Sequence, residues 1–66
     1  MPDKKIVGMR LRKLRGKKSI SIVARDLSCT PMAVSLWERG LRMPRDETKL
    51  KLAAYYRRSV SSIFYK

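Results

Sequence analysis

Three arginines spaced three residues apart, Arg39, Arg42 and Arg45, are the side chains of this sequence best suited to bind an anion. A guanidinium group forms paired hydrogen bonds with phosphate, and such contacts supply affinity without selecting a sequence. Ser19 and Thr30 each precede a segment with helical periodicity, and the backbone amides at the start of a helix also bind phosphate. We predict phosphate contacts for these five residues, with a solvated surface charge as the alternative for any single arginine.

The whole chain is strongly basic, with 17 Lys and Arg against 5 Asp and Glu and a formal net charge of +12. Such an excess attracts polyanions at long range and says nothing about the fold. Nucleic acid, an anionic membrane surface and an acidic protein all remain candidate partners, but no apolar stretch approaches the roughly 20 residues of a membrane span. Six of the nine residues from Arg10 to Lys18 are basic, and either a solvated face or direct phosphate contact explains that run.

Residue types needed for other chemistries are scarce. The sequence contains no His, one Cys and no glycine-rich loop that could hold a phosphate. We therefore expect no enzyme, no metal site, no cofactor and no small-molecule ligand. Cys29 is predicted to be a buried free thiol, because a single cysteine forms no internal disulfide. The first five residues lack the apolar segment of a signal peptide, so we expect a cytoplasmic protein.

The elements that must position these side chains are predicted to be helices. Apolar residues recur with a period of about 3.6 and no alternation is sustained, so we expect an all-α fold, a compact five-helix bundle. A chain of 66 residues has room for a single domain, residues 1–66. The predicted helices run from a cap at Asp3 to Arg15, from a cap at Ser19 to Leu27, from Pro31 to Arg39, from Asp46 to Arg57, and for a short distance after Ser59.

Each predicted helix has an inward, apolar face. The expected core residues are Val7, Leu11 and Leu14 with Ile6 alongside, then Ala24 and Leu27, Val34 and Trp37, Leu52, Ala53 and Tyr56, and finally Val60, Ile63 and Phe64.

The second and third predicted helices are separated by a very short turn. The apolar pattern stops at Ser28, Thr30 then supplies a hydroxyl cap followed by proline, and Gly40 ends the second of the two helices. Two short helices joined by a tight turn are typical of a helix-turn-helix motif, here at about residues 19–39. On a chain of this charge, the motif predicts binding to double-stranded DNA.

The outer face of the helix that begins at Pro31 would then lie nearest to the bases, because such a helix contacts bases mainly near its N-terminus. Among the candidate residues only the serine has a hydrogen-bonding side chain, so apolar contact with thymine methyl groups is one interpretation. Weak direct contact with the bases and a protein-binding use are the alternatives. The predicted base-proximal residues are Pro31, Met32, Ala33, Ser35 and Leu36.

Two charged residues are assigned a structural role. Arg15 ends the first predicted helix, and Glu38 lies next to the core residue Trp37 on the third. A salt bridge between Arg15 and Glu38 would join the two helices.

Several segments resemble the Xre-type helix-turn-helix domains, the phage-repressor or Cro-like group of regulators. VGMRLRKLR (Val7 to Arg15) resembles the first helix of that family, WERG (Trp37 to Gly40) the end of its helix-turn-helix, PRDETKLKLA from Pro44 the fourth helix, and SVSSIFY from Ser59 the fifth. The resemblance implies a five-helix domain that binds operator DNA, commonly as a two-fold dimer, with an Arg15–Glu38 pair and a phosphate at the start of the second helix. The sequence departs from the family in a shorter spacing between Arg15 and Ala24, and in apolar residues where polar base contacts are usual.

The leading hypothesis is a sequence-specific transcriptional regulator, a repressor that binds a short palindromic operator as a homodimer and is associated with the nucleoid when bound. The alternative is a protein-interaction module of the same fold, an antirepressor or adaptor that uses the apolar outer face of the third helix. A non-specific nucleoid or RNA binder is a third class, supported by charge alone. We predict a dimer surface at Ile63, Phe64 and Tyr65.

Overall fold

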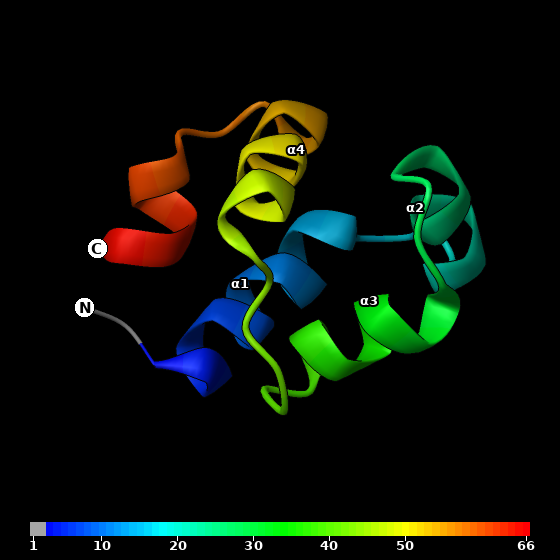
Figure 1. Ribbon diagram of the computed structural model, residues 1–66, viewed down its shortest axis with the longest axis horizontal. Coiled ribbons are helices and arrows are strands. Elements are labelled where there is room, and N and C mark those ends of the chain that lie inside the picture. The colour runs from blue at the N-terminus through cyan, green and yellow to red at the C-terminus, as the bar shows by residue number, and fades with distance from the viewer. Residues whose placement is uncertain (1–2) are drawn as a thin grey trace.

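The computed structural model describes residues 3–66, and every regular element in that range is a helix. Figure 1 shows α1 in the middle of the molecule, with α2 and α3 on one side and the C-terminal helix on the other. The helices are α1 (Lys4–Arg15), α2 (Ile20–Asp26), α3 (Pro31–Glu38), α4 (Asp46–Tyr56) and η1 (Ser61–Tyr65), the last a short π-helix. The predicted all-α fold of five helices is confirmed.

The starts of the first three helices follow the predicted capping residues. The side chains of Asp3, Ser19 and Thr30 each accept a hydrogen bond from the backbone amide three residues later, at 3.0, 3.1 and 3.1 Å respectively. Each such cap contributes about 1 kcal/mol, because it satisfies an amide that has no partner within the helix. α4 has no side-chain cap, but Asp46 and Glu47 lie in its first turn, where the helix dipole favours negative charge.

The ends of the helices are set by residues with positive φ. The amide of Ser28 (φ 56°) donates to the Arg25 carbonyl at 3.2 Å, and the amide of Cys29 donates to the Ala24 carbonyl at 2.9 Å. These two bonds close α2 and fix the turn before α3. Within residues 3–66, the residues with positive φ are Gly16, Ser28, Gly40 and Arg57.

The core is formed by apolar side chains from all five helices. Leu14, Leu27, Tyr56 and Val60 are partly buried and pack against it, whereas Ile6 is 42% exposed and does not extend the inward face of α1 as expected. The buried apolar side chains of the core are Val7, Leu11, Val23, Ala24, Val34, Trp37, Leu52, Ala53, Ile63 and Phe64.

Ile63 and Phe64 belong to this core and do not form a dimer surface, so that part of the prediction is wrong. Their exposed fractions are 2% and 1%, because η1 packs inward against the rest of the bundle. A chain this short must bury most of its large apolar side chains to fold at all. Tyr65 is 40% exposed, and its hydroxyl accepts a hydrogen bond from Lys49 Nζ at 3.1 Å.

Arg10 on α1 holds the last turn of the chain. Its guanidinium donates to the carbonyls of Ser62 and Ile63 at 3.2 and 3.0 Å, and to the carbonyl of Lys66. Carbonyls at the end of a helix have no partner within the helix, and the helix dipole favours a cation there. The arginine therefore satisfies the end of η1 and joins it to α1.

α1 and α3 approach each other closely at Gly8. A Cβ atom on Gly8 would lie 2.6 Å from the carbonyl oxygens of both Trp37 and Glu38, a distance that only glycine allows. At the end of α3, Gly40 adopts φ 74° and a Cβ there would lie 2.9 Å from the Cα of Lys5. Backbone contact at these two glycines fixes where α3 lies against α1.

Candidate nucleic-acid interface

The outward side of α3 carries four residues at helical spacing, which we call the outward stripe: Met32, Ser35, Leu36 and Arg39. Spacings of three, four and seven residues place these side chains on one helix face, opposite the buried Val34 and Trp37. Met32 is 64% exposed, while Ser35 and Leu36 are partly buried. Of the other predicted base-proximal residues, Pro31 is exposed and Ala33 is partly buried against the core.

The hydroxyl groups near this stripe already hold hydrogen bonds within the protein. Thr30 Oγ1 caps α3 by accepting from the Ala33 amide at 3.1 Å. Ser35 Oγ accepts from Arg39 Nη1 at 3.5 Å. Each hydroxyl keeps one O–H donor, and a hydroxyl donor discriminates little between bases. The polar capacity of the first two turns of α3 is therefore small.

We call Arg39, Arg42 and Arg45 the arginine cluster. All three are exposed, and none forms an ion pair with another residue in the range 3–66. The backbone amides of Leu41 and Arg42 both donate to the Leu36 carbonyl, at 3.0 and 3.3 Å, so the chain turns tightly after α3. Arg42 and Arg45 line one shallow surface hollow. The cluster thus places three guanidinium groups beside the end of α3, free to bind phosphate.

The basic run from Arg10 to Lys18 is divided between internal contacts and exposed charge. Arg10, Arg15 and Lys18 donate hydrogen bonds to other elements, whereas Lys13 and Lys17 are exposed. The sequence predicts the contact of Arg15 with Glu38, whereas it gives no indication of the contacts made by Arg10 and Lys18. The long separation along the chain between each cation and its partner left no local signal for them.

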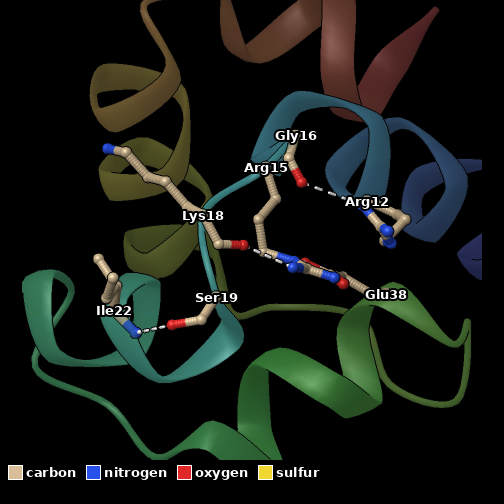
Figure 2. Close-up of polar contacts among 7 residues, drawn as sticks. All are labelled: Arg12, Arg15, Gly16, Lys18, Ser19, Ile22 and Glu38. Atoms are coloured by element: carbon tan, nitrogen blue, oxygen red, sulfur yellow. Dashed lines mark hydrogen bonds and ion pairs between the residues drawn. The ribbon is translucent and has the colours of Figure 1, made fainter.

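Arg15 and Glu38 form an ion pair at the junction of α1 and α3. Arg15 Nε lies 2.8 Å from Glu38 Oε2, and the two side chains are 12% and 7% exposed. Figure 2 shows the same guanidinium reaching the Lys18 carbonyl, to which Nη1 donates at 2.6 Å. The hydrogen bond to Glu38 raises the pKa of Arg15, with burial opposing it. One arginine therefore holds α3 and the segment before α2 against α1.

A second polar chain joins the segment before α2 to α4. Lys18 Nζ donates to the hydroxyl of Tyr55 at 3.0 Å, and that hydroxyl donates to Asp26 Oδ2 at 2.6 Å. The ammonium also lies 4.6 Å from the centre of the Tyr55 ring. Its hydrogen bond to Tyr55 raises the pKa of Lys18. Ser19, the next residue, is thereby held at the start of α2, where its hydroxyl caps the helix (Figure 2).

Tyr56 makes the stability of this region depend on alkaline pH. Burial raises the pKa of Tyr56 to about 12, and the Glu38 carboxylate acts in the same direction. The phenol of the unfolded chain titrates near about 10, so its stabilising contribution is complete below that pH and is lost as the pH rises towards 12. Between about pH 9 and about pH 11.5, we expect the wild type to lose on the order of 1–2 kcal/mol more unfolding free energy than Tyr56→Phe.

Urea unfolding of both proteins at the two pH values measures this difference. Lysines that titrate in the same range are common to both proteins and cancel. Equal losses of unfolding free energy in the wild type and in Tyr56→Phe would show that Tyr56 does not cause the pH dependence.

Cys29 is partly buried rather than fully buried, and it is a free thiol. Burial is the largest cause of its raised pKa, which Lys51 opposes. In the range 3–66, no helix has the length and apolar character needed to cross a bilayer.

The fold and the exposed face of α3 together define a helix-turn-helix DNA-binding protein. A helix-turn-helix family model matches residues 11–63, which spans α2, α3 and α4, the C-terminal part of α1 and the first three residues of η1. The chain belongs to the Xre-type helix-turn-helix family. Neither the curated proteins nor the solved structures contain a match to it.

Proposed function

We propose that this protein is a transcriptional repressor that binds a short palindromic operator as a homodimer, with α3 in the major groove. The observation that carries the proposal is the outer side of α3, where Met32 is exposed and the arginines of the cluster form no ion pair within residues 3–66. In helix-turn-helix proteins the second helix of the motif enters the groove while neighbouring segments contact the backbone. In this proposal α3 contacts bases and the arginine cluster contacts phosphates.

The roles of the two capping hydroxyls follow from the same docking. Ser19 and Thr30 lie at the starts of α2 and α3, and each keeps an O–H donor after capping its helix. We assign both donors to phosphate oxygens, since hydroxyl and backbone groups at helix starts commonly hold the DNA backbone. A repressor of this kind acts on DNA inside the cell, so the proposal places the protein in the cytoplasm.

The salt dependence of DNA binding tests the proposed phosphate contacts. The probe is a duplex recovered from a randomised library by binding selection, and a scrambled duplex gives the non-specific level. Each phosphate neutralised by a cation contributes about −0.9 to the slope of log affinity against log salt. We expect Arg39→Gln, Arg42→Gln and Arg45→Gln each to flatten that slope by about 1.8, because each substitution removes one phosphate contact from each of the two protomers.

The matched control is Arg58→Gln, which removes an exposed arginine from the segment between α4 and η1. It should leave the slope near the wild-type value. A wild-type slope near zero, or equal binding to selected and scrambled duplexes, would contradict the proposed function.

One observation favours the alternative function, a protein-interaction module. Met32 exposes 64% of its surface on α3, and a flexible methionine adapts well to an apolar partner surface. An antirepressor or adaptor would use Met32 and Leu36 as anchors and would not depend on them for binding DNA.

A further inference from the structure

We infer that the protein selects its DNA by the C5-methyl groups of thymine, through apolar contacts from Met32 and Leu36. The inference rests on the proposed function and names the chemical feature that the same face of α3 recognises. It concerns the preferred base and not the phosphate contacts.

The side chains at the start of α3 are poorly suited to polar contact with bases. Pro31 has no backbone N–H, Met32 and Leu36 have no hydrogen-bonding side-chain group, and Ala33 is partly turned into the core. None of them can make the paired hydrogen bonds by which arginine selects guanine or an amide side chain selects adenine. The first two turns therefore have little means of selecting a base by polar contact.

The two polar residues of the outward stripe, Ser35 and Arg39, contact each other. Ser35 Oγ accepts from Arg39 Nη1 at 3.5 Å, so the serine is turned along the helix towards the arginine. Arg39 is the last residue of the stripe and caps the end of α3, and the proposed docking assigns its guanidinium to phosphate. What remains exposed near the base edges is the apolar surface of Met32, together with part of Leu36.

The positive charge around this apolar surface indicates which kind of partner covers it. The arginine cluster lies at the end of the same helix without ion pairs in the described part of the chain, on a protein of net charge +12. A polyanion with an apolar feature complements that arrangement. The thymine C5-methyl group is the apolar feature of the major groove, and contact with it distinguishes thymine from the other three bases.

Replacement of thymine by uracil tests the inference, because it removes the methyl group and leaves the hydrogen-bonding edge of the base unchanged. Affinity is measured by fluorescence anisotropy for the selected duplex with thymine or with uracil at every position of the site. Removing one contacted methyl group should lower the affinity about fourfold, so a site with several contacts should lose tenfold or more.

The protein variants locate the effect. In Met32→Ala/Leu36→Ala, the ratio of thymine to uracil affinity should fall to about one while the salt slope stays unchanged. Met9→Ala/Leu50→Ala is the matched control, since these side chains are 71% and 62% exposed on α1 and α4. It should keep the wild-type ratio. Circular dichroism melts of both double variants establish that they are folded.

The possible outcomes distinguish a failure of this inference from a failure of the proposed function. Preferential binding of the selected duplex with no effect of uracil would overturn the inference and leave the proposed function standing. An unchanged thymine-to-uracil ratio in Met32→Ala/Leu36→Ala would also overturn it, and would favour a protein partner for that face. Equal binding to selected and scrambled duplexes would instead remove the proposed function itself.

Discussion

Gly8→Ala should destabilise the protein severely, although alanine is the better helix former. In an exposed helix interior, Gly→Ala stabilises by about 0.5–1 kcal/mol. Here the new methyl group would lie 2.6 Å from two backbone carbonyl oxygens of α3, and backbone atoms cannot move aside as a flexible side chain can. Helix α1 must then separate from α3, with an expected cost of about 3 kcal/mol or more.

Thermal unfolding followed by circular dichroism measures the effect. For a domain of this size each kcal/mol shifts Tm by about 4–8 °C, so we expect Tm to fall by about 12 °C or more. Met9→Ala, an exposed substitution at the next position of α1, is the control and should change Tm little. A rise in Tm for Gly8→Ala would show that α1 and α3 do not meet at the backbone.

Glu38→Gln should be the second large loss, because it leaves the Arg15 guanidinium buried without its counter-charge. Breaking a fully buried ion pair by removing one partner costs about 3–5 kcal/mol. Arg15 and Glu38 retain 12% and 7% exposure, so we expect about 2–3 kcal/mol. The orientation of α3 depends on the same contact, and DNA affinity should fall together with stability.

The exposed pair Arg25–Asp26 provides the comparison for Glu38→Gln. Its atoms are 3.7 Å apart and the Arg25 side chain is 76% exposed, so Arg25→Gln should cost less than about 0.5 kcal/mol. Arg15→Leu/Glu38→Leu should lose less than the sum of the two single variants, since replacing both charges removes the unpaired ion. Equilibrium urea unfolding is measured for Glu38→Gln, Arg25→Gln, Arg15→Leu, Glu38→Leu and the double variant. Equal losses for Glu38→Gln and Arg25→Gln would assign the buried pair no structural role.

The features that could be predicted from sequence are those with a local signal. Ser19 and Thr30 are followed by helical periodicity, and both cap the expected helices. Gly40 adopts the left-handed conformation expected after α3. Hydroxyl caps and glycine ends depend on the few residues around them, and the helix-turn-helix between them could therefore be placed almost to the residue.

The features that could not be predicted depend on contacts between distant segments. Gly8 reads as an unremarkable helix interior residue until Trp37 and Glu38 are packed against it. Arg10 donates hydrogen bonds to carbonyls more than fifty residues away along the chain, so its charge is used inside the protein. Ser28 adopts positive φ without being glycine, because two hydrogen bonds at the end of α2 hold it there.

The apolar residues Ile63 and Phe64 near the C-terminus show the same limit of sequence-based prediction. Ile63 and Phe64 have the periodicity of an apolar face, and periodicity alone does not distinguish a core face from a dimer surface. The structure resolves the choice, since η1 buries both side chains in the core. For the site, Met32 and the arginine cluster are exposed as DNA contact requires, Ser35 and Leu36 are partly exposed, and the contacts themselves stay predictions.

Hydroxyl-radical footprinting of the selected duplex tests the central claim most directly, namely that α3 docks in the major groove of a specific two-fold site. The account predicts two protected half-sites about 10 bp apart, bound by two protomers, with protection lost in the variant that lacks all three arginines of the cluster. Protection spread evenly along the duplex, or none at any salt concentration that preserves the fold, would contradict it.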